Sequence, residues 1–365
     1  GPPCLVIFDN APCHGDVADL LPQKRRVRAI VTSRENDFPS ETFRPVRLDE
    51  LPMPEAVELL RRIAGEAYRD DDGAEGLAEV LGRMPLALRQ AAAWAAEAGV
   101  GFAEAAERIE DIIRATPPSN YPDPVIATVD LTLDRLRAAA EGADADAARR
   151  AGDALALLDL LPWLAPEGVD VKLVTDVATT EYQPTTLEGL DPRIRDMAQD
   201  AARVGRAVTA LVRRSLAVAG EGTGPTRTVA LHRLTAAVLR ARALAGGAAE
   251  RQAQAAAAAV AAGYPGGSRP PTDHRTWDDC RRLNPHVAAL HALSARAEEP
   301  GTPATAAMDF LLNQASIFFR NRNDAETAVA YAEAALDLKI ARLGADHPTV
   351  GIGRNALAGA LIQAR

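Results

Sequence analysis

The segment Cys4-Leu5-Val6-Ile7-Phe8-Asp9-Asn10 has five apolar residues in a row, followed by an acid and an amide. A run that is apolar on both faces predicts a central strand buried in a parallel sheet, with cover on each side. Residues 27–34 begin with a second such run, and residues 44–48 are a short third candidate. Between the first two runs, residues 16–21 allow only a brief helix. These pieces predict the second half of an α/β sheet.

After Leu51 the pattern becomes helical. Pro54 suits the first turn of a helix, and apolar residues then recur on one face until Gly65: Ala56, Leu59, Leu60 and Ile63. The same reasoning predicts helices over residues 73–81, 85–98 and 102–114. Residues 117–124 contain four prolines and predict a linker.

The next part combines helices with a hairpin. Helical patterns cover residues 125–140, 144–161, 169–178 and 193–214. Two short β-prone stretches follow, at 215–219 and 226–231, joined by the glycine-rich residues 220–225. Three helices followed by such a hairpin predict a winged helix.

The C-terminal part is rich in helix formers. Residues 234–262 contain almost nothing else, and residues 263–271 predict a loop. From Pro303 the chain has the pattern of paired helices. The predicted fold is therefore multidomain and mostly α, with a small α/β portion at the start.

Five short motifs along the chain resemble motifs of a known protein class. Leu5-Val6-Ile7-Phe8-Asp9-Asn10 resembles a Walker B strand, and Val31-Thr32-Ser33-Arg34 resembles a sensor strand whose arginine reads a terminal phosphate. Gly82-Arg83-Met84-Pro85-Leu86-Ala87-Leu88 is similar to a "GLPLAL" turn, and Leu231-His232-Arg233 takes the place of an "MHD" triplet. Residues 332–348 resemble a tetratricopeptide (TPR) repeat of the kinesin-light-chain type.

In this order, the motifs resemble a STAND-type NTPase of the NB-ARC kind with a TPR tail. The segment from Trp277 to Leu283-Asn284-Pro285-His286 points to the bacterial FxSxA-TPR group. The resemblance implies five parts: a partial NB-ARC α/β nucleotide-binding domain (1–50), a helical ARC domain (51–118), a winged-helix domain (119–245), a helical linker (246–301) and a partial TPR array (302–365). It implies a signal-transduction switch that binds ADP or ATP with Mg²⁺.

The resemblance assigns catalytic positions to Asp9 and Asn10. Asp9 would hold Mg²⁺ directly or through water at the carboxyl end of its strand; its alternative role is to cap the following loop. Many family members have a second acid at the position of Asn10. Because an amide cannot accept a proton from water at neutral pH, slow hydrolysis is expected even in an intact relative.

Three further residues are implied to bind nucleotide. Arg34 would present its planar guanidinium to a γ-phosphate, or instead pair with Glu35 or Asp37 at the strand end. Pro85 would face the base or ribose while also starting a helix. His232 would contact the β-phosphate of ADP, or simply start a helix. The usual Met and Asp around that histidine are replaced by Leu231 and Arg233.

The chain has no Walker A motif. G-x-x-x-x-G-K-[ST] needs a lysine after glycine, but Lys24, Lys172 and Lys339 follow Gln23, Val171 and Leu338. We therefore expect little or no ATP affinity from this chain. Either an N-terminal portion has been removed or the gene is degenerate, and an in-frame Walker A upstream would distinguish these two origins.

Composition excludes several classes. The net charge of −9 argues against non-specific nucleic-acid binding, and no apolar run reaches the roughly 18–20 residues of a membrane span. Three cysteines indicate no disulfide framework, so a cytoplasmic location is expected. No paired spacing indicates zinc, and no HExxH, GxSxG or GxGxxG motif is present. His274, Cys280, His286 and His291 are interpreted as structural, and Arg213-Arg214 and Arg281-Arg282 as solvated.

Two other functions remain open. A non-catalytic scaffold would bind a protein or peptide through its TPR helices, since helix pairs must stack to bury their apolar faces. Only about one and a half repeats are visible, so we expect a truncation or packing against another chain, which includes oligomerisation. A transcription regulator would use the winged helix instead. A salt-dependent gel shift with Arg213 and Arg214 changed would test DNA binding.

Overall fold

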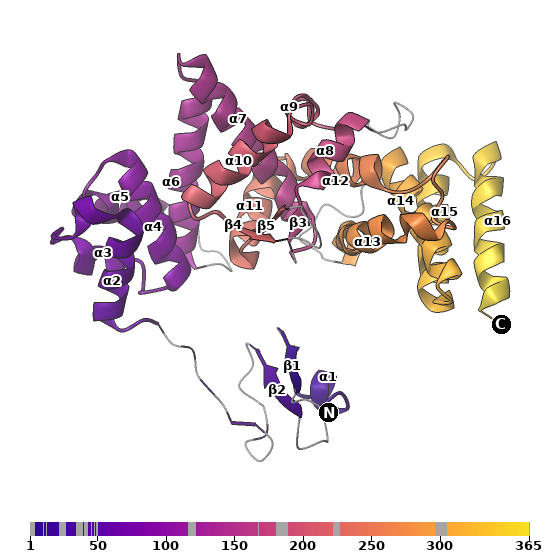
Figure 1. Cartoon of the computed structure of the whole chain (residues 1–365), viewed down its shortest axis with the longest axis horizontal. Coiled ribbons are helices and arrows are strands. Elements are labelled where there is room, and N and C mark those ends of the chain that lie inside the picture. Colours follow the sequence, from indigo (N-terminus) through magenta and orange to yellow (C-terminus); the bar gives the residue numbers. More distant parts are fainter. Residues whose placement is uncertain are drawn as a thin grey trace. The chain divides into compact units, whose positions relative to one another are not determined.

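The structure is a computed structural model that describes residues 4–9, 11, 13–21, 27–33, 39, 43–44, 46, 48, 50–115, 122–166, 168–179, 189–221, 227–295 and 305–364. These residues form a mostly helical fold with one two-stranded and one three-stranded sheet (Figure 1). The chain separates into two compact units, Gly1–Glu50 and Leu51–Arg365. We call them unit 1 and unit 2.

Unit 1 contains a parallel strand pair. Strand β1 (Cys4–Phe8) pairs with β2 (Val27–Val31), from Cys4 opposite Val27 to Phe8 opposite Val31, and the four-residue helix α1 (Gly15–Ala18) lies between them in sequence. The parallel pairing was predicted, but the prediction of a buried strand is wrong: Leu5 is 54% exposed and Ile7 61%. No described helix of this unit is longer than α1, so the described part offers little to cover a strand face.

The predicted third strand at 44–48 is not found either. Residues 44, 46 and 48, which are the described ones in that stretch, belong to no strand, and Val46 and Leu48 are exposed.

Unit 2 begins with helices whose local signals were clear. Pro54 lies in the first turn of α2 (Met53–Ala64), which buries Ala56 and Leu60 and ends before Gly65. A short 3₁₀ turn follows (Glu66–Tyr68), and then α3 (Ala74–Val80), α4 (Pro85–Ala98) and α5 (Phe102–Ala115). The structure confirms the helix predicted over residues 85–98. Of the predicted linker at 117–124, residues 117–121 lie outside the described residues, and the next helix already begins at Asp123.

The middle of unit 2 holds an antiparallel three-stranded sheet in the order β3-β5-β4. Its elements in chain order are α6 (Asp123–Ala140), α7 (Ala145–Leu160), the 3₁₀ turn η2 (Leu161–Trp163), β3 (Val169–Asp170), α8 (Lys172–Thr179), α9 (Pro192–Met197), α10 (Ala201–Arg213), β4 (Ala217–Glu221), β5 (Arg227–Leu231) and α11 (Arg233–Ala245). The helix predicted over 193–214 is in fact two, because Asp200 caps α10 by accepting a hydrogen bond from the Ala202 N–H at 2.8 Å.

The described residues of the last part of unit 2 form helices joined by loops, with no strand among them. This part consists of α12 (Ala249–Gly263), a 3₁₀ turn (His274–Thr276), α13 (Trp277–His291), a second turn (Ala292–Ala295), α14 (Ala306–Asn321), α15 (Ala325–Leu343) and α16 (Pro348–Gln363). The run of helix formers at 234–262 is interrupted where Gly247 takes a left-handed φ of 66°.

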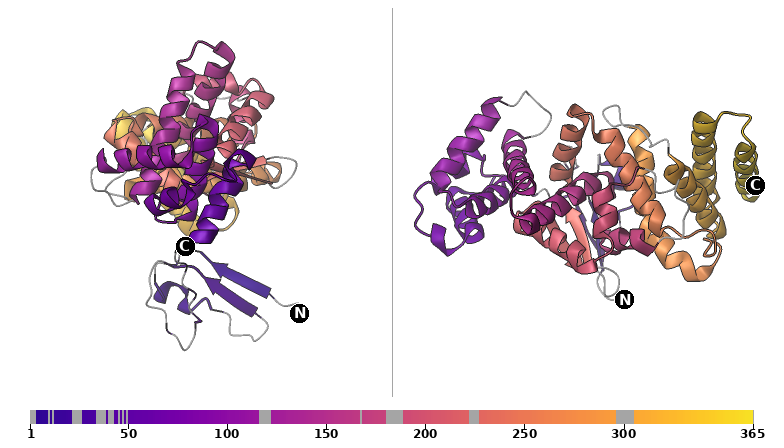
Figure 2. Two further views of the ribbon diagram at one scale, coloured as in Figure 1. Left: turned by 90° about the vertical axis from the view of Figure 1, so that its left-hand side faces the viewer. Right: turned by 90° about the horizontal axis from the view of Figure 1, so that it is seen from above.

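Helix α12 lies at the centre of this packing. Its alanines are buried, and it packs against α7, α8, α11, α13 and α14. Small side chains allow these helices to approach closely. From α14 onward each helix packs on the next, as Figure 2 also shows. No helix in the described part of the chain has the length and apolar character needed to span a bilayer.

Candidate functional site

The residues expected to bind nucleotide belong to different units. Asp9 lies in unit 1, and Pro85 and His232 lie in unit 2. Asn10 and Arg34 fall outside the described residues.

In unit 1, Asp9 follows β1 and is held from the neighbouring strand. Its carboxylate accepts a hydrogen bond from the Thr32 hydroxyl at 2.7 Å, and the Thr32 N–H donates to the Phe8 carbonyl at 2.9 Å. The Ala11 N–H donates to the Thr32 carbonyl, also at 2.9 Å. These bonds fix Asp9 at the carboxyl ends of the parallel strands, the edge at which open α/β sheets bind ligands.

The chemistry of Asp9 suits magnesium only together with a nucleotide. Among the described residues, no group of three or more His, Cys, Asp or Glu side chains could hold a metal ion. Magnesium is commonly held by one or two carboxylates, with phosphate oxygens and water completing its shell. A single carboxylate at Asp9 fits that arrangement when phosphates supply the remaining ligands.

In unit 2, the turn before Pro85 has an unusual backbone. Gly82 and Arg83 both take left-handed φ angles, 57° and 52°, before Met84 returns to an extended conformation. A left-handed arginine costs roughly 1–2 kcal/mol. Two backbone bonds hold it there: the Arg83 N–H donates to the Ala78 carbonyl at 2.9 Å, and the Leu51 N–H donates to the Arg83 carbonyl at 3.2 Å. Pro85 is thus presented by a firmly held turn.

His232 connects β5 to α11. Its Nδ1 accepts a hydrogen bond from the Leu234 N–H at 3.2 Å, so the imidazole caps the helix. Removal from water, and secondarily the charge of Arg233, lower the pKa of His232 below its ordinary value of 6.5. The ring is therefore neutral at pH 7. With Nδ1 as acceptor, Nε2 carries the proton and can donate to a phosphate oxygen.

A buried polar network joins the helices that begin at Pro85 and His232. Gln90 of α4 donates from Nε2 to the Thr235 hydroxyl of α11 at 3.1 Å, and its Oε1 accepts from the Thr128 hydroxyl of α6 at 2.8 Å. All three side chains belong to buried residues. Gln90 is five residues after Pro85, about 8 Å along the helix axis, and Thr235 is three after His232. A side-chain hydrogen bond thus joins the second turn of α4 to the first turn of α11.

Ion pairs also connect α11 with α6, and the end of α10 with α4. Arg242 of α11 binds Asp130 of α6, with its Nε 3.0 Å from the carboxylate, and Arg214, just after α10, binds Glu97 of α4. Burial raises the pKa of Asp130, and Arg242 opposes that shift. The interpretation of Arg214 as a solvated side chain is wrong, because Glu97 draws it against α4; Arg213 beside it is exposed.

In the pair Arg281-Arg282, too, one arginine is exposed and the other is held in an ion pair. Arg281 is exposed, but Arg282 is largely buried, with its Nη2 3.0 Å from the Asp176 carboxylate of α8. The structural interpretation of His286 and Cys280 agrees with their burial, and the His286 Nδ1 accepts from the Ala165 N–H at 3.1 Å.

Sequence reasoning missed the buried network. Its signal is present, since Gln90 interrupts a run of alanine and leucine, and Thr128 lies on an apolar helix face. A polar residue in such a position must find a buried partner. The pattern does not say which partner, because Thr235 is 145 residues away.

Comparison with known proteins adds no family. Neither the protein-family models nor the curated proteins contain a match to this chain.

Proposed function

We propose that the chain is part of a regulatory nucleotide switch of the STAND/NB-ARC class. The observation that carries the proposal is the buried contact between Gln90 and Thr235. It joins the helix that begins at Pro85 to the helix capped by His232. These are the two positions of unit 2 that the resemblance assigns to nucleotide binding.

The order of elements supports the domains that the resemblance implies. An antiparallel sheet in the order β3-β5-β4, with α8 to α10 between β3 and the β4–β5 hairpin, is the arrangement expected of a winged helix. Helices α14, α15 and α16 pack in sequence with short connections, as expected of TPR helices. The parallel β1–β2 pair with Asp9 at its carboxyl end suits a nucleotide-binding sheet.

In this proposal, the residues have separate tasks. Asp9 holds Mg²⁺ against the phosphates of ADP or ATP, and Arg34 reads the terminal phosphate. The neutral His232 donates from Nε2 to a phosphate oxygen. Because His232 also caps α11, nucleotide binding biases the packing of α11 against α4, and a partner bound at residues 302–365 biases nucleotide affinity in return. Asn10 makes hydrolysis slow.

The test is calorimetric titration of ADP into the gene product, with any residues that its gene encodes before Gly1. We expect saturable binding that His232→Ala weakens at least about tenfold, the lower limit for one hydrogen bond to a charged group. His347→Ala is the matched control, since His347 caps α16 in the same way, accepting from the Thr349 N–H at 3.3 Å. Absence of both ADP and ATP binding, or equal effects of the two variants, overturns the switch.

A second candidate is the non-catalytic scaffold, which one observation favours. Helix α16 exposes Ile352, Leu361 and Ile362, three large apolar side chains, to solvent. Such side chains suit a protein or peptide partner. If the gene product binds neither ADP nor ATP, this function replaces the switch. Partner binding, measured by calorimetry, should then be lost in Ile362→Asp and kept in Arg354→Asp, a change on the same helix.

A further inference from the structure

A cavity of about 230 Å³ lies where α8, the end of α12, the loop after α12 and α13 meet. Its lining combines charged side chains with the backbone of a glycine-rich loop, Gly266-Gly267-Ser268. None of its residues belongs to the predicted nucleotide site. A ligand in this cavity would therefore bind apart from the residues of the proposed nucleotide switch.

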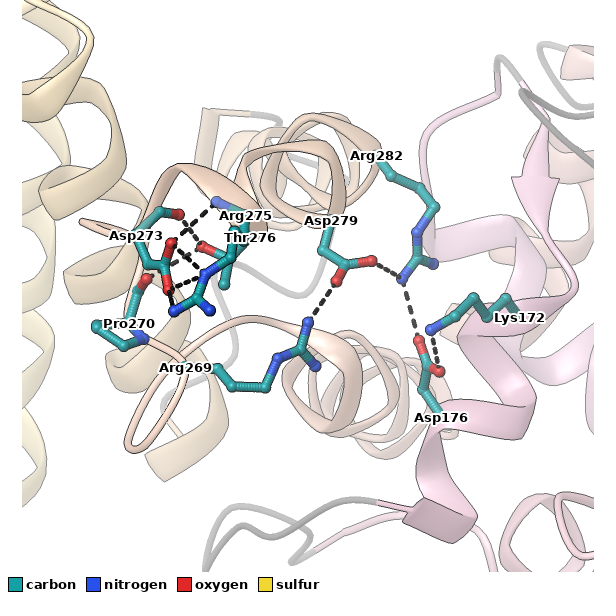
Figure 3. Close-up of polar contacts among 9 residues, drawn as sticks. All are labelled: Lys172, Asp176, Arg269, Pro270, Asp273, Arg275, Thr276, Asp279 and Arg282. Atoms are coloured by element: carbon teal, nitrogen blue, oxygen red, sulfur yellow. Dashed lines mark hydrogen bonds and ion pairs between the residues drawn. The ribbon is translucent and has the colours of Figure 1, made fainter.

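Five charged side chains form an alternating ladder beside the cavity (Figure 3). Lys172 pairs with Asp176, and Asp176 pairs with Arg282 at 3.0 Å. Arg282 also contacts Asp279 at 3.3 Å, and Asp279 pairs with Arg269 at 2.9 Å. The ladder has three cations and two anions, so its net charge is positive. Both end cations, Lys172 and Arg269, line the cavity.

The ladder leaves donors, rather than acceptors, facing the cavity. Each carboxylate oxygen of Asp176 and Asp279 already contacts a cation. Lysine has three N–H donors and arginine five. Within the described part of the chain, Lys172 Nζ contacts only Asp176, and the Arg269 guanidinium contacts only Asp279. A ligand that is rich in acceptors and negatively charged can therefore bind the remaining donors of Lys172 and Arg269, although Asp176 and Asp279 also line the cavity.

Glycine gives the cavity its shape. A Cβ at Gly263 would lie 2.7 Å from the Asp176 Oδ2, so only glycine allows the end of α12 to approach the ladder this closely. Gly267 takes a left-handed φ of 56°, and the Arg269 N–H closes the turn by donating to the Gly266 carbonyl at 3.0 Å. The turn places Arg269 at the cavity and lets backbone approach a bound anion.

We propose that this cavity binds the phosphate group of a small phosphorylated molecule, with Lys172 and Arg269 as its cationic contacts. A phosphate carries close to two charges at neutral pH and has enough oxygens to accept from an ammonium and a guanidinium together. The volume sets the size of the ligand, because pockets for drug-sized molecules measure roughly 300–1,000 Å³. This cavity admits a phosphate and a few further atoms.

The test is calorimetric titration of the chain with inorganic phosphate and, separately, with glycerol 3-phosphate, at pH 8 and constant ionic strength set with chloride. We expect saturable binding of one molecule per chain for at least one probe. Tighter binding of glycerol 3-phosphate would identify an organic phosphate as the ligand, and equal binding would identify free phosphate; either result supports the site.

Arg269→Gln and Lys172→Met should each weaken binding at least about tenfold. Arg275→Gln is the matched control: Arg275 is 79% exposed against 64% for Arg269, and it pairs with Asp273 outside the cavity lining. Because the Arg269 side chain is so exposed, its variant keeps the fold even if Lys172→Met does not. No saturable binding of either probe, or equal affinities of the Arg269 and Arg275 variants, overturns the proposal.

Discussion

The strand pairs β1–β2 and β4–β5 have the same length but different surroundings. Each is held by five residue pairs, parallel in the first and antiparallel in the second. In the second, α10 packs against β4 and η2 against β5, and Val229 and Leu231 are buried. The β1–β2 pair has the more apolar sequence, and yet its residue Ile7 is mostly exposed. An apolar run therefore specifies a strand, whereas burial requires another element packed over it.

The largest expected effect is on stability, and it compares a buried and an exposed residue of the β4–β5 pair. Leu231→Ala should lower the free energy of unfolding by about 2–5 kcal/mol, because Leu231 is 7% exposed and its removal leaves a cavity. Val218→Ala on the partner strand β4, where Val218 is 64% exposed, should cost less than about 0.5 kcal/mol. Urea unfolding followed by tryptophan fluorescence measures both, because Trp94, Trp163 and Trp277 all lie in unit 2. Equal losses would contradict the burial of β5.

A second effect concerns a buried titratable group. Burial, with a smaller contribution from Arg282, lowers the pKa of His286 to about 4. The unfolded chain takes up that proton near pH 6.5, whereas the fold resists it. The contribution of His286 to the free energy of unfolding is therefore fully present above pH 6.5. It decreases as the pH falls toward 4, by up to about 3 kcal/mol in total.

Urea unfolding at a series of pH values measures this slope. His286→Gln should flatten it between pH 6.5 and 4. His274→Gln is the control, because the His274 side chain is 81% exposed, and it should leave the slope unchanged. An unchanged slope in the His286 variant would show that this group does not cause it.

A third effect tests the buried network between α4, α6 and α11. Gln90→Leu leaves the Thr235 hydroxyl without its donor and should lower the free energy of unfolding by about 1–3 kcal/mol. Gln363→Leu removes an exposed bond to the Arg320 carbonyl and should cost less than about 0.5 kcal/mol. Similar urea midpoints for the two variants would mean that the network contributes little to the junction.

The smallest effect is expected for a substitution in the exposed β1–β2 pair. Ile7→Thr keeps a β-branched side chain and changes only its exposed surface, so the protection of the β1 amides against hydrogen exchange should stay within about threefold of the parent. Mass spectrometry of peptides covering residues 4–9 measures this. A loss of protection above tenfold would show that a partner covers Ile7 in solution.

Much of the fold could be predicted where the signals are local. Helix α4 has the bounds that were predicted: Pro85 starts it as expected, because proline suits a helix start, and it ends where Gly99 takes the left-handed conformation. The break at Asp200 was missed, since an aspartate within a helical pattern is recognised as a cap only when its side chain is seen to accept from the next turn.

The candidate sites were predicted less completely. Sequence patterns placed His232 at the junction of β5 and α11 and Asp9 at the end of β1, and the structure agrees on both positions. The nucleotide roles of these residues stay predictions. The ladder from Lys172 to Arg269 carried no recognisable motif, because its members come from α8, α13 and a loop and meet only after packing.

The sequence by itself determined most of the helices and the β4–β5 hairpin, because proline, glycine, capping residues and apolar spacing act over a few neighbouring positions. Only the tertiary structure decided which polar groups meet: Gln90 with Thr235, and Arg282 with Asp176, 106 residues apart. It also decided that Leu231 is covered while Ile7 is exposed. These outcomes depend on which distant elements pack together, and the pattern around a single residue does not encode that choice.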